Sequence, residues 1–107
     1  MTAGDVVLLN FPFSDLSGAK LRPAVVVAVV DRDEFVACMI TSKRKSVGPS
    51  IELVDRSFKR GGLRIVSFAR PGKLFTADRR IVVRRVGQLN PNVLDRIRDA
   101  IVHLIMK

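Results

Sequence analysis

Short runs of apolar residues, separated by polar turns, extend through most of the chain. In the run at residues 24–30, seven apolar residues follow one another without alternation. This predicts a strand buried on both faces at the centre of a sheet. The turn at residues 31–33 leads into residues 34–41, which we expect to pair with that strand as an antiparallel hairpin. About six strands are predicted in all, the others at residues 5–11, 50–54, 64–68 and 80–86.

Polar segments rich in Gly and Pro separate these runs, and the end of the chain has a different period. Loops are predicted at residues 12–21, 43–50, 55–62 and 69–78, and Pro71-Gly72 predicts a bend in the last of them. After Asn90, a candidate cap, and Pro91, apolar residues recur at helical spacing at Leu94, Ile97, Ala100, Ile101, Leu104 and Ile105. The pattern therefore predicts a mostly β fold with a C-terminal helix, built as a small, strongly bent barrel-like sheet.

The composition narrows the class of protein. A chain of 107 residues suits a single domain over residues 1–107, and a hydrophobic fraction of 48% is enough for a core. No apolar run approaches the ~20 residues that span a bilayer, and the N-terminus does not resemble a signal peptide, so we expect a cytoplasmic protein without membrane association. The single cysteine, Cys38, has apolar neighbours and is expected to be an unreactive core residue, the alternative being a reactive thiol.

Positive charge is concentrated in the later two thirds of the chain. Nineteen Lys and Arg against ten Asp and Glu give a net charge of +9. By segment, residues 1–42 carry 3 basic and 5 acidic groups (−2), residues 43–73 carry 9 and 2 (+7), and residues 74–107 carry 7 and 3 (+4). Such a distribution predicts binding to a polyanion, above all RNA, because basic groups release the counterions of phosphates. The alternative is a basic surface that only keeps the protein soluble.

Most of the common catalytic motifs are missing from the sequence. There is no Walker-type phosphate loop, no CxxC pair and only one histidine, so no metal site built from His or Cys and no cofactor is expected. His103 follows Asp99 by four residues on the polar face of the predicted helix and is expected to be solvated. Any chemistry must therefore come from Arg, Lys and hydroxyl side chains.

Arg22 and Thr41 stand at the ends of the two strands of the predicted hairpin. Arg22 directly precedes Pro23, which favours an extended backbone, at the entry to the central strand. If the two strands pair through the turn at residues 31–33, Arg22 and Thr41 become neighbours. Two other interpretations stay open, in which Arg22 pairs with a surface carboxylate and Thr41-Ser42 only form a turn.

Several stretches together resemble the MazF/PemK family of toxin–antitoxin endoribonucleases. They are Gly4-Asp5, the loop Phe-Pro-Phe-Ser-Asp-Leu-Ser-Gly, Arg22-Pro23-Ala24-Val25-Val26-Val27, Ile40-Thr41-Ser42 and Val86-Gly87-Gln88-Leu89. The resemblance spans nearly the whole chain. It implies a small SH3-like barrel of the CcdB/MazF type that forms a homodimer and is neutralised by a cognate antitoxin. It also implies metal-independent cleavage of single-stranded RNA, including mRNA, through attack of a 2′-hydroxyl on the adjacent phosphate.

The resemblance also suggests roles for individual residues. Arg22 would stabilise the charge that develops on the phosphoryl oxygens, with protonation of the leaving oxygen as a second role, and Thr41 would hydrogen-bond the same phosphate. The candidate RNA-binding residues are Ser42, Lys43, Lys20, Ser67, Arg70 and Lys73.

The later strand departs from the family pattern. Some members have an Arg and an Asp there, whereas this chain reads Ser67-Phe68-Ala69-Arg70, so the resemblance supplies no general base. Ser67 either contacts RNA or only ends its strand. A CcdB-like poison of DNA gyrase and a non-catalytic RNA-binding barrel remain the alternative functions.

Overall fold

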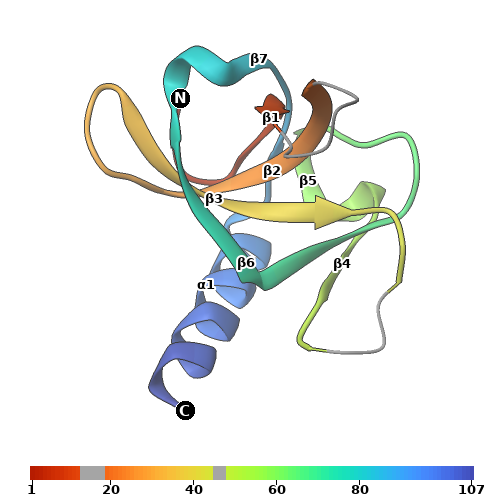
Figure 1. Ribbon diagram of the computed structural model, residues 1–107. Helices are drawn as coiled ribbons and strands as arrows, with labels where there is room; N and C mark the ends of the chain where they lie inside the picture. The colour runs from red at the N-terminus through yellow and green to blue at the C-terminus, as the bar shows by residue number, and fades with distance from the viewer. Residues whose placement is uncertain (13–18, 45–47) are drawn as a thin grey trace.

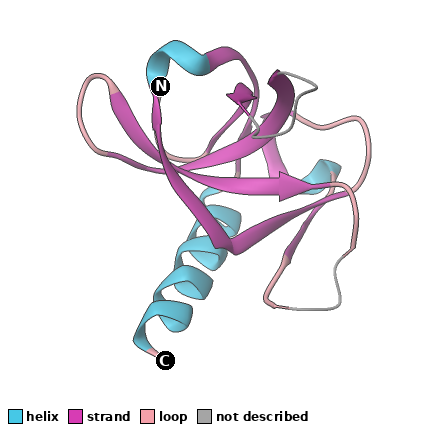
Figure 2. Ribbon diagram, viewed as in Figure 1, coloured by secondary structure: helices cyan, strands magenta, loops and turns pink. Residues whose placement is uncertain are grey.

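A computed structural model describes residues 1–12, 19–44 and 48–107. Within these residues, seven strands form one sheet in the order β4-β6-β3-β2-β1-β7-β5, and all neighbouring strands are antiparallel (Figure 1). The predicted fold class, mostly β with a C-terminal helix, is confirmed (Figure 2). The elements are β1 (Asp5–Pro12), β2 (Ala19–Val29), β3 (Glu34–Thr41), β4 (Ile51–Leu53), the 3₁₀ turn η1 (Asp55–Ser57), β5 (Phe58–Gly61), β6 (Ser67–Asp78), the 3₁₀ turn η2 (Arg79–Ile81), β7 (Val82–Leu89) and α1 (Pro91–Met106).

The chain connection between the two edge strands makes the sheet curl. Seven flat strands would hold the edge strands β4 and β5 about 29 Å apart, since neighbouring strands lie about 4.8 Å apart. The five residue steps from Leu53 to Phe58 reach only about 18 Å when fully extended. The edges must therefore approach each other, and the sheet in Figure 1 is curled like a partly open barrel.

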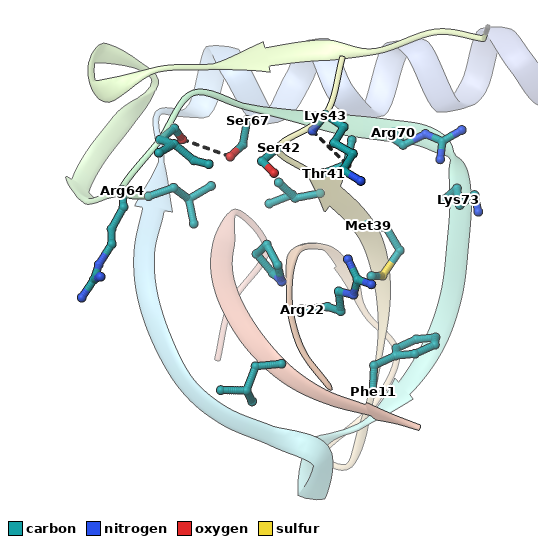
Figure 3. Close-up of a pocket in the computed structure, with 15 residues that line it drawn as sticks. Phe11, Arg22, Met39, Thr41, Ser42, Lys43, Arg64, Ser67, Arg70 and Lys73 are labelled. Atoms are coloured by element: carbon teal, nitrogen blue, oxygen red, sulfur yellow. Dashed lines mark hydrogen bonds between the residues drawn. The ribbon is translucent and has the colours of Figure 1, made fainter. Parts of the chain in front are cut away.

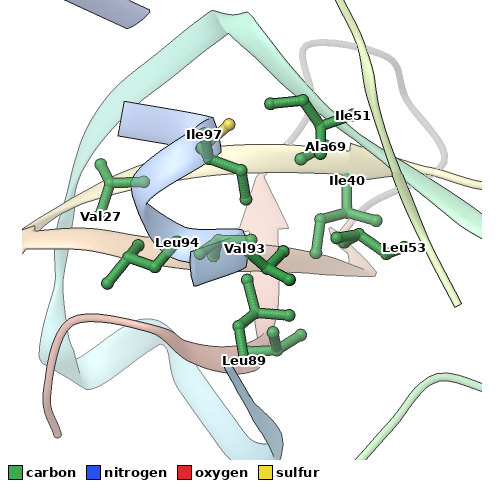
Figure 4. Packing of buried hydrophobic residues seen from close by; sticks show 12 residues of the cluster. Val27, Ile40, Ile51, Leu53, Ala69, Leu89, Val93, Leu94 and Ile97 are labelled. Carbon is green, nitrogen blue, oxygen red and sulfur yellow. The ribbon is translucent and has the colours of Figure 1, made fainter. Parts of the chain in front are cut away.

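The central strand β2 is buried on both faces, as predicted from its unbroken apolar run. Val25 and Val27 belong to one core cluster, in which Val27 lies near Ile97 of α1 (Figure 4). Ala24 and Val26 pack into a second cluster on the other face. This burial ends at Val27, because residues 28–30 are exposed. The core thus anchors β2, and Arg22 lies on this strand three residues before the buried Val25.

The structure differs from the sequence prediction at three of the four predicted loops. β2 begins at Ala19, so residues 19–21 are strand, while residues 13–18 lie outside the described residues. The segment at residues 55–62, predicted to be a loop, contains η1 and the edge strand β5. The strand predicted at residues 64–68 instead begins at Ser67 and continues through residues 69–78, which we expected to be a loop.

Pro71-Gly72 produces a bulge within β6 instead of ending the strand. Ile40 of β3 pairs with Ala69, whereas Cys38 pairs with Leu74, so residues 70–73 of β6 lie opposite Met39 alone. Extra residues on one strand bend it and direct their side chains away from the ladder. The bend predicted at Pro71-Gly72 is therefore present, inside a strand and not in a loop.

The helix α1 begins after Asn90, as predicted, but the Asn90 side chain does not cap it. Its Nδ2 donates to the Arg56 carbonyl at 2.9 Å, which ties the helix start to η1. Ile105, which was assigned to the apolar face, is 69% exposed, and His103 is exposed as expected. Among the described residues, no helix combines the length and apolar character needed to cross a membrane.

Candidate active site

A cavity of about 640 Å³ opens where the start of β2, the end of β3 and the bulge of β6 meet (Figure 3). Seven of the eight residues that the sequence singled out line it: Arg22, Thr41, Ser42, Lys43, Ser67, Arg70 and Lys73. The volume lies within the usual range for ligand sites, about 300–1,000 Å³. Residues from four separate parts of the sequence thus converge on one concave surface.

The charge of the cavity is of one sign. Among the described residues that line it there is no Asp, Glu or His. A concave surface carrying one sign of charge concentrates the field and attracts counter-ions of the opposite sign. An extended chain of phosphates suits this surface, since several anionic groups can be held at once. The lining cations are Arg22, Lys43, Arg64, Arg70 and Lys73.

Arg22 and Thr41 come together through the register of the β2–β3 hairpin. The last β2–β3 pair at this end joins Ala24 to Met39, and two more residues along each strand bring Arg22 opposite Thr41. Both residues line the cavity, and Arg22 is half-buried. Both residues therefore belong to one cavity, and the joint action of the guanidinium and the hydroxyl on one phosphate stays a prediction.

The Thr41 hydroxyl takes part in the turn that follows β3. Its Oγ1 accepts a hydrogen bond from the Lys43 backbone N–H at 3.1 Å. A hydroxyl has one hydrogen and two lone pairs, so this bond leaves its hydrogen to be donated to an incoming oxygen. The turn interpretation and the phosphate-binding interpretation of Thr41 are therefore compatible.

The bulge of β6 carries Arg70 and Lys73 to the cavity. Behind it, the Cys38 thiol donates to the Arg70 carbonyl at 3.2 Å. Cys38 is fully buried, and this burial raises the pKa of its thiol to about 12. The burial confirms the predicted placement of Cys38 in the core, and a thiol in its neutral form is a poor nucleophile.

Ser67 lies in the wall of the cavity but is only 4% exposed. Its Oγ donates to the Ile65 carbonyl at 3.0 Å, so its hydrogen is already used within the protein (Figure 3). The structure thus gives Ser67 a local bond to the segment before β6.

Part of the cavity was not predicted from the sequence, and one predicted residue lies outside it. Lys20 is exposed on β2, paired with Phe11 of β1, and is not among the lining residues. Arg64 was placed in a strand but lies in the connection between β5 and β6. Its position after Gly61-Gly62 was the one available signal, since a double glycine favours a turn. The apolar lining residues Phe11, Met39, Leu63 and Ile65 were assigned no site role either.

Two of the motif stretches noted in the sequence hold the N-terminus in place. Gly4 has φ +95°, a conformation that favours glycine. Asp5 is 1% exposed and accepts from the Thr2 N–H at 2.9 Å and from the Gln88 side-chain amide at 3.3 Å. Arg85 of β7 lies 3.6 Å from the same carboxylate. The Gly4-Asp5 stretch and Gln88 therefore fix β1 against β7, away from the cavity.

Comparison with known structures agrees with this architecture. MazF from Deinococcus radiodurans is 19% identical, covers 100% of this chain and 97% of its own, and has a TM-score of 0.73. An endoribonuclease in complex with its cognate antitoxin, from a mycobacterial species, is 16% identical over 98% of this chain and 94% of its own, with a TM-score of 0.72. A MazE-MazF structure from D. radiodurans is 20% identical over 98% of this chain and 94% of its own, with a TM-score of 0.69. At these identities the likeness establishes a MazF-like fold.

The family itself is established at the level of sequence. A search of curated proteins found no match. The family described as "PemK-like, MazF-like toxin of type II toxin-antitoxin system" matches residues 2–105. Because this match covers nearly the whole chain, the protein belongs to the PemK-like, MazF-like toxins of type II toxin–antitoxin systems.

Proposed function

We propose that this protein is the toxin of a type II toxin–antitoxin pair and that it cleaves single-stranded RNA in the cytoplasm without a metal ion. The observation that carries the proposal is the cavity that Arg22 and Thr41 line together with further cations, with no carboxylate among its described lining residues. Family membership and the MazF-like fold point in the same direction.

In the proposed reaction the RNA supplies its own nucleophile. The 2′-oxygen attacks the adjacent phosphorus and loses its proton to water, while the bond from phosphorus to the 5′-oxygen breaks and that oxygen gains a proton from water. The products are a 2′,3′-cyclic phosphate and a 5′-hydroxyl. Negative charge grows on the non-bridging oxygens in the transition state, and this is the charge that a fixed guanidinium stabilises.

Each side chain has a role that follows from its chemistry. Arg22 can span two phosphoryl oxygens with its planar fork, and Thr41 can donate its remaining hydrogen to one of them. Arg70 and Lys73 on the bulge, with Lys43 after β3, would hold neighbouring phosphates. Because the described lining residues include no carboxylate or imidazole, we assign this site to charge stabilisation and positioning, not to proton abstraction by a side chain.

The partner of the toxin is proposed to be an antitoxin with an acidic segment. Solved relatives include an endoribonuclease with its cognate antitoxin and a MazE-MazF complex. An acidic segment laid over the five lining cations would exclude RNA by occupying its phosphate positions. We also propose a homodimer, because a domain of this size with many apolar strand residues buries part of them against a second copy. Light scattering should then give about twice 11.9 kDa.

The two alternative functions have less support. The family match and the solved structures above concern MazF-like toxins and endoribonucleases, which gives a gyrase poison no support. A non-catalytic RNA-binding barrel would need the same cations but would not need Arg22 and Thr41 beside each other.

The test of the proposal is the chemistry of the cleaved ends. Purified protein is incubated with single-stranded RNA in excess EDTA, and the fragments are analysed by mass spectrometry. We expect cleavage that leaves 2′,3′-cyclic phosphate and 5′-hydroxyl ends, and a substrate with one 2′-deoxy nucleotide at the cleavage position should stay intact. Cleavage that leaves 5′-phosphate ends or that continues past the 2′-deoxy position would refute the mechanism, and tight binding without cleavage would favour the non-catalytic barrel.

A further inference from the structure

Residues 63–65, between β5 and β6, form a thin wall between two cavities. Leu63, Arg64 and Ile65 line the active-site cavity on one side and a smaller cavity of about 170 Å³ on the other. Ile65 is 61% exposed in a cavity that is also lined by five cations. An apolar side chain exposed there offers a packing surface to an apolar part of a ligand.

This wall is anchored at both ends. On the side of β5, the Gly62 N–H donates to the Val86 carbonyl at 3.1 Å. On the side of β6, buried Ser67 pairs with Leu53 of β4, and its Oγ–H donates to the Ile65 carbonyl at 3.0 Å. The hydroxyl of Ser67 therefore holds the backbone of Ile65 directly.

Cations and apolar side chains both occur along the length of the cavity. In Figure 3, Ser67 and Arg64 lie at one end, Phe11 lies at the other, and Arg22 lies between them. Phe11 is supported by an edge-to-face contact with Phe75, with ring centroids 4.9 Å apart. A strand whose reacting phosphate rests on Arg22 would have flanking nucleotides near both ends.

Cations and apolar side chains recognise different parts of RNA. Contacts to phosphates position the strand but carry no sequence information, whereas unstacked bases are read by surfaces that pack on their faces and by hydrogen bonds to their edges. The five cations therefore account for affinity and catalysis, while the wall offers an apolar contact for a base.

We propose that residues 63–65 are a base-contacting wall in which Ile65 packs against one unstacked base beside the scissile phosphate, and that Ser67 is the positioning residue that holds Ile65 there. This inference rests on the proposed function, because it places RNA in the same cavity. It assigns Ser67 a role through Ile65 in place of direct contact with RNA.

The test couples side chains to individual bases. Ile65→Ala is compared with Val66→Ala, whose side chain is 49% exposed but lies outside the active-site cavity. Once the cleavage position is mapped, each protein is assayed on the intact RNA and on a series with one abasic nucleotide at successive positions. We expect Ile65→Ala to lower kcat/KM on intact RNA about tenfold, the effect of losing an apolar contact of this size, mainly through KM. The loss should disappear when one particular base is absent, and Val66→Ala should show no such dependence.

Ser67 is tested in the same series. Ser67→Ala should show the same loss of activity that depends on that one base. Ser67→Thr, which keeps the hydroxyl, should restore the wild-type kcat/KM on intact RNA. A purely structural role would lower activity equally on every RNA. Equal losses on all RNAs, or the same pattern in Val66→Ala, would overturn the proposal.

A binding measurement separates this inference from the proposed function. The dissociation constants of the same variants are measured by fluorescence anisotropy with labelled, non-cleavable 2′-deoxy oligonucleotides that carry the abasic series. If no cleavage occurs but Ile65→Ala still couples to one base, the ribonuclease proposal fails and the wall stands. Cleavage without any coupling would refute the wall and leave the ribonuclease intact.

Discussion

Replacing Arg22 by Ala should remove most of the catalytic rate and little of the affinity for RNA. The register of β2 and β3 places Arg22 opposite Thr41, and the side chain is half-buried in the cavity wall. Four other cations remain in the cavity to attract the strand. Loss of one donor to a developing oxyanion usually lowers kcat by about 100- to 1,000-fold, or roughly 2.7–4 kcal/mol. We expect a loss in this range, at least about 100-fold.

Two further variants distinguish charge from geometry. Arg22→Lys keeps the charge but cannot span two oxygens, so it should recover little of the rate. Thr41→Val is nearly isosteric and should lower kcat by a smaller factor, because it removes one neutral donor. Single-turnover kinetics on a fluorescent RNA at saturating protein would measure the chemical step directly.

The control is Arg32→Ala, which removes an exposed arginine outside the cavity. It should cleave like the wild type, and all four variants should keep the wild-type melting temperature. A folded Arg22→Ala protein that cleaves near the wild-type kcat would refute the assignment. A rise in KM with kcat unchanged would instead make Arg22 one attracting charge among several.

Three other predictions follow from particular contacts and charges. Gly61→Ala should destabilise the protein far more than Gly48→Ala, as measured by urea unfolding. Both glycines have positive φ, but a Cβ at Gly61 would collide with the Val86 carbonyl, whereas a Cβ at Gly48 would lie within 4 Å of no atom of the described residues. Burial raises the pKa of the Cys38 thiol to about 12. As the pH rises, the thiol therefore loses its proton in the unfolded chain before it does so in the folded protein. The free energy of unfolding should fall between about pH 9 and 12, by up to about 1.4 kcal/mol per pH unit. Cys38→Ala should remove that part of the pH dependence in unfolding measurements at pH 8 and pH 10.5, and an unchanged slope would contradict the burial argument. RNA affinity, measured by anisotropy over a salt series, should show a log–log slope of about −3.5 if all five cavity cations contact a single strand, and a nearly flat response would point to a protein target.

Much of the architecture follows from local pattern alone. The unbroken apolar run before the turn at residues 31–33 defines the central hairpin, because a strand buried on both faces has no polar side to show. The turn pairs Val29 with Phe35, a register that would place Arg22 opposite Ser42. A shift of one residue between Val26 and Ala28, which the turn does not determine, moves Arg22 opposite Thr41. The helix after Asn90 is equally local, because its apolar spacing and Pro91 act within a few residues.

The remaining features depend on contacts between residues far apart in the sequence. Pro71-Gly72 would end an isolated strand, but pairing with β3 on both sides of the bulge keeps β6 continuous. The strand β5 is short and polar, and it exists because β7 supplies its hydrogen-bonding partner. The propensity of a short segment does not include the effect of a partner strand far away in the sequence, here β3 or β7. The sequence pattern therefore predicted loops at both places.

Contacts between residues far apart in the sequence also decide which side chains line the cavity. Lys20 and Arg70 looked alike in the sequence as basic residues near strand ends, but β2 carries Lys20 outside the cavity while the bulge carries Arg70 into its wall. Arg64 and Ile65 enter the cavity because the curl of the sheet brings the connection between β5 and β6 back beside the end of β3. The sequence by itself determined the hairpin, the helix and the positive charge, since these arise from neighbouring residues. The curl and the bulge decided which of the charged and apolar side chains line the cavity, because only the curled sheet brings distant parts of the sequence together.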